Sequence, residues 1–178
     1  TEELKRVGQH RNFSRGQQLF TTLSCAQCHQ LGKAGAAGPP IHQDLNHSHL
    51  PSVAVGPNLG EAVKKLKGDA KTVLQEILEP SRNVEEKYRK IVLELEDESY
   101  VSGNIIAEDE QSVTIQTGPT AALAKTIIKK SIVSRRPSPI SIMPAGLLDP
   151  LDKEQILDVL AYVLAGGDAS HEAFQHKH

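Results

Sequence analysis

The sequence predicts an α+β protein that is mainly α-helical and contains an inserted small antiparallel β-sheet or open barrel. Amphipathic helices are expected near both ends of the chain, at residues 14–23 and 153–164. Between them, over residues 91–133, short runs alternate apolar with polar residues, which is the period of a β-strand. The length of 178 residues suits one domain, or one domain that carries a sizeable insertion.

The first expected helix has a face of small and apolar residues. Gly16, Phe20 and Leu23 recur at i, i+4 and i+7, and Ser14 is expected to be the N-cap. Because glycine carries no Cβ, Gly16 would let another helix approach closely.

The last expected helix begins after Asp152 and ends at Gly166 and Gly167. Tyr162 lies beside its apolar face. We therefore expect Phe20 and Tyr162 to lie near a crossing between the two helices.

The expected strands are separated by short polar turns. The first three runs are residues 91–95, 101–107 and 113–115, and residues 127–133 supply one or two more. Four or five short strands of this kind indicate a small antiparallel sheet or an open barrel.

The most specific motif is Cys25-Ala26-Gln27-Cys28-His29, which contains both cysteines of the chain. C-x-x-C-H is the attachment signature of a c-type haem. Two thiols at this spacing on a helical turn can each add to one vinyl group of the porphyrin. The next residue, His29, then lies under the iron as its proximal ligand. The motif predicts one covalently attached haem c.

Three other chemistries use such a cysteine pair. A structural zinc site needs a second ligand pair at matching spacing, and the sequence has no second C-x-x-C. A thioredoxin-like dithiol follows a β-strand, whereas Cys25 follows an expected helix. A disulfide across two intervening residues is strained and gives His29 no role. The haem interpretation is favoured over all three.

Composition and charge limit the classes of partner. The chain has no Trp, three Tyr and three Phe, and a buried haem would supply apolar bulk that aromatic side chains otherwise provide. A net charge of -2 predicts no general affinity for nucleic acid or for an anionic membrane. No apolar run approaches the roughly 20 residues that span a membrane, and no signal peptide opens the chain.

Haem c is attached outside the cytoplasm in bacteria, so the motif predicts a periplasmic or otherwise extracytoplasmic protein. Thr1 is therefore expected to be the start of a processed protein or of a domain excised from a longer one.

Several segments together resemble class I cytochromes c. The matching segments are Gly16-x-x-x-Phe20 before the cysteine motif, Gly56-Pro57-Asn58-Leu59, Met143-Pro144, and the last helix with Tyr162. The resemblance implies a cytochrome c fold with crossing terminal helices. It implies that the Pro57 carbonyl orients His29, with Gly38-Pro39-Pro40 as a second candidate for that role. It also implies that Met143 binds the opposite face of the iron.

The long interval between His29 and Met143 departs from a minimal cytochrome, and the expected strands fill it. This arrangement resembles the planctomycete-type extracytoplasmic haem c domain. The resemblance divides the chain into an N-terminal extension (1–13), a cytochrome c core with the haem attachment (14–85) and a β-rich insertion (86–136). The distal-ligand loop and last helix of the core (137–166) and a disordered tail (167–178) follow. Residues 40–55 are expected to be a local insertion.

Met143 is the only methionine, and a thioether is a soft ligand that favours reduced iron. A methionine that fills a gap in the core is the alternative. His42, His47 and His49 are rival ligands, which would give bis-histidine coordination, hold an adventitious metal, or lie in a solvated loop.

Charge is unevenly distributed in the strand region. Residues 91–110 contain seven acidic residues and no Lys or Arg, and residues 111–148 contain five basic residues and no acid. The two segments are either ordinary solvated surfaces or the poles of a dipole that steers an acidic redox partner.

The expected function is one-electron transfer by a haem with His29 and Met143 as axial ligands, so the chain is not expected to be an enzyme by itself. One alternative is a haem-based gas sensor with a labile Met143. Another is an electron-transfer domain excised from a larger secreted dehydrogenase. A peroxidase-like enzyme ranks last, because the sequence offers no distal acid-base pair.

Overall fold

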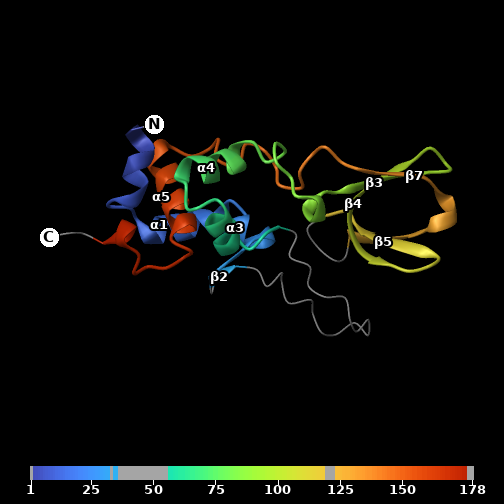
Figure 1. Cartoon of the computed structure of the whole chain (residues 1–178), viewed down its shortest axis with the longest axis horizontal. Coiled ribbons are helices and arrows are strands. Elements are labelled where there is room, and N and C mark those ends of the chain that lie inside the picture. The colour runs from blue at the N-terminus through green and yellow to red at the C-terminus, as the bar shows by residue number, and fades with distance from the viewer. Residues whose placement is uncertain (1, 33, 36–55, 119–122, 176–178) are drawn as a thin grey trace.

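The computed structural model describes residues 2–32, 34–35, 56–118 and 123–175. Figure 1 shows the helices gathered at one end of an elongated molecule and a five-stranded sheet at the other. Two segments run side by side between these ends, one leaving α4 (Ala70–Leu78) and one returning towards α5 (Lys153–Leu164). The part of the chain that carries the cysteine motif lies in the helical end.

The first and last major helices, α1 (Phe13–Thr22) and α5, cross at Gly16. A Cβ on Gly16 would lie 2.5 Å from the Asp158 carbonyl oxygen and 2.8 Å from the Tyr162 Cβ. The rings of Phe20 and Tyr162 meet there with their centroids 5.5 Å apart. The expected close crossing is confirmed.

The predicted N-cap of the first helix is wrong. Asn12, not Ser14, caps α1, because its side-chain oxygen accepts a hydrogen bond from the Arg15 N–H at 2.9 Å. The helix thus begins at Phe13, whose ring packs edge-on against Tyr162. The Asp152 cap of α5 is as predicted.

Both ends of the described chain pack against the helical core. A 3₁₀ turn, η1 (Glu2–Gly8), places Leu4 and Val7 on the core cluster. The predicted disorder after residue 167 is wrong for residues 167–175, where η5 (Glu172–Phe174) forms and Ala173 is buried. Phe174 stacks edge-on against Phe13, which explains the order of this segment.

The remaining elements of the helical end begin with the cysteine motif itself. They are α2 (Cys25–Cys28), a short ladder of β1 (Gln30–Leu31) with β2 (Ala34–Gly35), and α3 (Leu59–Lys65), which precedes α4. Asn58 and Asp69 cap α3 and α4 through their side chains. The buried residues of this core are Phe20, Leu31, Val73, Leu148, Val159, Leu160, Tyr162 and Val163.

The sheet contains β3 (Ile91–Leu95), β4 (Tyr100–Glu108), β5 (Ser112–Gln116), β6 (Ala124–Ile128) and β7 (Ile132–Pro137). All neighbours are antiparallel and the order is β6-β5-β4-β3-β7. The expected strands are therefore present, with two strands over residues 124–137. A 3₁₀ turn, η2 (Glu86–Tyr88), precedes β3.

The sheet curls strongly. Its edge strands β6 and β7 are joined only by the 3₁₀ turn η4 (Lys129–Ser131). Four residue steps reach at most about 14 Å, whereas four strand spacings in a flat sheet cover roughly 19 Å. The linked ends of the edge strands must therefore bend towards one another. Leu93, Val113 and Ile115 are buried in this sheet.

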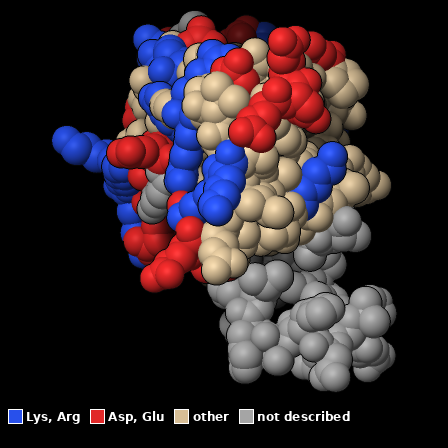
Figure 2. Space-filling view, turned by 90° about the vertical axis from the view of Figure 1, so that its right-hand side faces the viewer, with Lys and Arg blue, Asp and Glu red and all other residues tan. Residues whose placement is uncertain are grey.

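The acidic and basic segments of the strand region are neighbours in this one sheet. Glu108 on β4 binds Lys129 at 2.9 Å and Arg135 at 3.0 Å, and these partners lower the pKa of its carboxyl group. Figure 2 shows the sheet end, where a patch of acidic side chains lies beside a band of basic ones. The ion pairs of Glu108 thus partly neutralise the two segments.

Among the helices of the described residues, none is long and apolar enough for a membrane crossing.

Candidate haem site

The two cysteines lie on the single helical turn α2. Ser24 precedes the turn in the left-handed conformation, with φ at 63°. Cys25 and Cys28 are free thiols, not a disulfide, and both are partly buried. Their i, i+3 spacing places them on one side of the turn.

His29 ends this turn and enters extended backbone, with φ at -117° and ψ at 139°. Its backbone N–H donates to the Cys25 carbonyl at 2.9 Å, so the backbone of His29 is anchored to the cysteine turn. His29 is 9% exposed, and its burial lowers the pKa of the ring. A neutral imidazole, which is the form that binds a metal, is therefore favoured.

The ring of His29 is oriented by Pro57. His29 Nδ1 lies 2.9 Å from the Pro57 carbonyl oxygen. A carbonyl only accepts hydrogen bonds, so Nδ1 carries the proton and Nε2 keeps the lone pair. This is the tautomer that a metal ligand requires.

Gly56 packs against the same ring. A Cβ on Gly56 would lie 2.5 Å from His29 Cε1 and 2.8 Å from Nδ1. The Gly56 N–H donates to the Cys28 carbonyl at 3.0 Å, and this bond connects the backbone at Gly56 to the cysteine turn. Only glycine leaves room for the imidazole there.

A large, mostly apolar cavity of about 1010 Å³ lies over these residues. It brings the cysteine motif, with Cys25, Cys28 and His29, together with Pro57 and Met143, which are distant in the sequence. Its volume is at the upper end of the roughly 300–1,000 Å³ of ordinary small-molecule pockets. The paired thiols, the imidazole with a free Nε2 and the apolar walls fit a c-type haem.

The loop that carries Met143 is tethered to the segment after α4. The Met143 N–H donates to Ser141 Oγ at 3.1 Å, and the Ser141 N–H donates to Ser81 Oγ at 3.0 Å. The α4 helix itself contributes Val73, Glu76 and Ile77 to the cavity wall. Helix and loop therefore enclose the cavity together.

Burial also changes the cysteine thiols. It raises the pKa of Cys25 to about 11 and raises the pKa of Cys28 above its usual value. The free thiols of the folded chain are therefore protonated near neutral pH and are poor nucleophiles.

Some predicted ligands and positions lie outside the described residues. These are His42, His47 and His49, the alternative prolines Pro39 and Pro40, the expected insertion at 40–55, Thr1, and residues 176–178 of the expected tail. Within the described ranges, no three His, Cys, Asp or Glu side chains gather as a metal-binding group.

Sequence reasoning missed several residues of the site. Gly56 contacts His29, and its position next to the expected Pro57 was the one sequence signal for this contact. Four further residues line the cavity from segments that flank the strands. Tyr88 ends η2 and Lys90 directly precedes β3, whereas Thr117 and Gly118 directly follow β5. No local pattern pointed to them, because their positions depend on how the sheet meets the helices.

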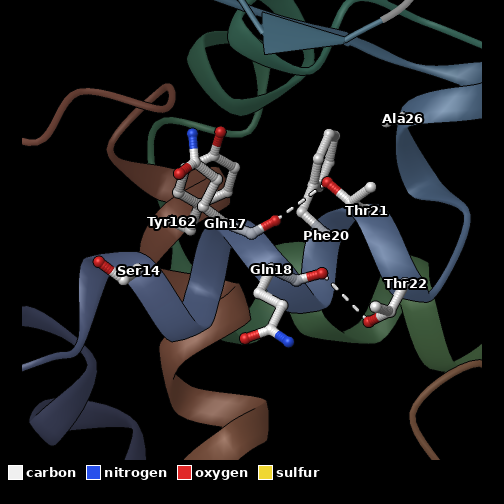
Figure 3. A pocket seen from close by; sticks show the side chains of 8 residues that line it. All are labelled: Ser14, Gln17, Gln18, Phe20, Thr21, Thr22, Ala26 and Tyr162. Atoms are coloured by element: carbon white, nitrogen blue, oxygen red, sulfur yellow. Dashed lines mark hydrogen bonds between the residues drawn. The ribbon is translucent and has the colours of Figure 1, made fainter.

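A second hollow, of about 400 Å³, lies over α1. Figure 3 shows its polar rim, in which the hydroxyls of Thr21 and Thr22 donate to the carbonyls of Gln17 and Gln18. Phe20, Ala26 and Tyr162 are its apolar residues. Those hydroxyls are bound within their own helix, which suits an ordinary helix surface.

Residues 13–98 match the family model of cytochrome c. No curated protein matches the chain. The family match supports a cytochrome c-like domain, and it spans α1, the cysteine turn and β3 but ends before Met143. Cytochrome c domains bind haem c covalently, carry its iron and generally act as electron carriers. The family match accordingly supports one covalently attached haem c as the cofactor.

Proposed function

We propose that the chain is a one-electron carrier whose haem is tethered by Cys25 and Cys28 and bound axially by His29 and Met143. The observation that carries the proposal is the shared cavity, since Cys25, Cys28, His29 and Met143 line the same apolar space. Bound haem c supplies an iron that takes up and releases one electron.

His29 serves as the fixed proximal ligand. Its Nδ1–H is held by the Pro57 carbonyl and its ring is confined by Gly56. These contacts keep Nε2 available and limit rotation of the imidazole. A ligand that does not move between oxidation states keeps the structural cost of electron transfer small.

Met143 serves as the distal ligand. A thioether favours the reduced iron and raises the reduction potential relative to a second histidine. The tether through Ser141 and Ser81 limits the freedom of the loop, which supports a retained ligand. With both axial positions filled, no position is open to a substrate, and this favours a carrier over an enzyme.

The arrangement of elements supports a finer proposal about the class. Residues 14–85 and 137–166 form a class I-like core, and residues 86–136 form an insertion of the planctomycete type. The sheet lies in the chain between α4 and α5, which supports this division. The protein then works outside the cytoplasm with a redox partner protein, either alone or as part of a larger dehydrogenase.

Replacement of Met143 tests the axial assignment. Met143→Ala is expected to open the distal position, lower the reduction potential and allow carbon monoxide to bind the ferrous protein. Leu147→Ala removes another side chain of the same cavity wall and is the matched control, with an unchanged axial spectrum expected. An unchanged spectrum in Met143→Ala contradicts the assignment. Ready binding of carbon monoxide by the wild-type protein favours a gas sensor.

A further inference from the structure

Segments that flank the sheet form one side of the cavity that holds the cysteine motif. Tyr88 and Lys90 line it from the entry to β3, and Thr117 and Gly118 line it from the end of β5. The turn η2 lies where the helical end meets the sheet in Figure 1. Residues from outside the helical end of the molecule are thus close enough to contact a ligand in this cavity.

The charged residues of the cavity wall differ in whether they have an ion-pair partner. Lys65 binds Glu85 at 2.7 Å, Glu61 binds Lys64 at 3.0 Å and Glu76 binds Arg82 at 3.4 Å. Lys90, by contrast, has no ion pair or side-chain hydrogen bond with any residue in the described part of the chain. Lys90 is half-buried as a residue, and its ammonium group has no counter-charge among the described residues.

The backbone of Lys90 is fixed at this position. Its carbonyl accepts a hydrogen bond from the Ser138 N–H at 2.8 Å. The next residue, Ile91, pairs with Pro137 in the ladder of β3 with β7. The segment that follows β7 leads to Met143, so Lys90 and the Met143 loop are held by the same pair of strands.

We propose that Lys90 binds a propionate carboxylate of the haem. The inference rests on the proposed occupation of this cavity by haem c. Attachment through the vinyl groups leaves the propionates free as carboxylates, and an unpaired ammonium group in the cavity wall is their electrostatic complement. An ion pair at such a half-buried, mostly apolar site is screened less than one in water. The segment that enters the sheet then contributes a cofactor-binding residue of its own.

A positive charge at this place also affects the iron. Oxidation adds one positive charge to the haem, and a nearby ammonium group opposes that change. Lys90 therefore raises the reduction potential, and its neutralisation lowers it.

The test uses the haem-loaded protein with its haem propionates labelled with ¹³C. Lys90→Gln removes the charge and keeps most of the side-chain length, whereas Lys90→Arg keeps the charge. Lys130→Gln is the matched control, because Lys130 is an exposed lysine of the same sheet region that does not line the cavity. The measurements are the midpoint potential and the redox-induced infrared difference spectrum of the labelled carboxylates.

Lys90→Gln is expected to lower the midpoint potential and to shift a labelled propionate band. Lys90→Arg is expected to keep both close to the wild-type values. Lys130→Gln is expected to change the potential and the band less than Lys90→Gln does. An unshifted propionate band in Lys90→Gln overturns the proposal, even if the potential falls. These results are taken from variants that keep the wild-type low-spin spectrum. A wild-type protein without haem in this cavity contradicts the proposed function itself and is distinguished by the absence of that spectrum.

Discussion

Gly56 lies against the face of the His29 imidazole, so closely that a Cβ at residue 56 would be 2.5 Å from Cε1. Gly56→Ala is therefore expected to displace the ring and weaken its hydrogen bond to Pro57. Overpacking of this kind costs about 1–3 kcal/mol of stability. Chemical unfolding of the haem protein, followed by its visible spectrum, measures the loss.

Gly8→Ala provides the control for this substitution, because a Cβ on Gly8 would have no neighbour within 4 Å. Its stability should stay within about 0.5 kcal/mol of wild type. Equal stability of Gly56→Ala and Gly8→Ala would show that the imidazole is not confined by residue 56.

His29→Ala is expected to abolish the low-spin spectrum while some thioether attachment survives, because the cysteines and the iron ligand are separate groups. Added imidazole should restore part of the spectrum by binding at the vacated side of the iron. His171→Ala is the control, since His171 caps η5 at the end of the described chain. A normal low-spin spectrum in His29→Ala rules out the proximal role.

Gly16→Ala is expected to force α1 and α5 apart. The new Cβ would lie 2.5 Å from the backbone carbonyl oxygen of Asp158, and a helix backbone cannot yield as a flexible side chain does. We expect a net loss of about 1–3 kcal/mol despite the better helix propensity of alanine. Equilibrium denaturant unfolding measures it, and a stabilised variant would contradict the close crossing.

Ser141→Ala removes the acceptor for the Met143 N–H. The loss of one such bond costs about 1 kcal/mol, and the Met143 loop should open more often. Faster binding of carbon monoxide by the ferrous protein is the expected readout. Ser134→Ala is the control, because it removes a hydroxyl bound to Glu94 in the sheet. Identical rates in both variants would mean that Ser141 does not restrain Met143.

Elements with a clear period were predictable from the sequence. The α5 helix has both an apolar face and a capping box of Asp152 with Gln155, so its limits matched the expectation. The alternation over residues 91–95 likewise located β3. Helix limits were less predictable where two nearby residues could both serve as the N-cap. Asn12 caps α1, although Ser14 was expected to do so.

Non-local features were not predictable. Nothing near Phe174 in the sequence reveals that its ring meets Phe13, so residues 167–175 looked like a free tail. The pairing of Glu108 with Arg135 depends on how the sheet curls, so the two charged segments appeared separate. Lys90 joined the cavity for a similar reason, since no local pattern says where the sheet meets the helices.

The cysteine motif indicated the cofactor because its chemistry is local. The contacts that position the ligands are not local, and they include the approach of Gly56 to His29 and the tether from Ser81 to Ser141. Pro57 was anticipated only through resemblance to a family, and the hydrogen bond it accepts from His29 is a feature of the fold.

The visible absorption spectrum of the purified ferric protein, matured where haem c can be attached, tests the central claim most directly. Axial binding by His29 and Met143 predicts a low-spin haem spectrum with a charge-transfer band from methionine sulfur to iron. A high-spin spectrum, or a low-spin spectrum without that band, would contradict it.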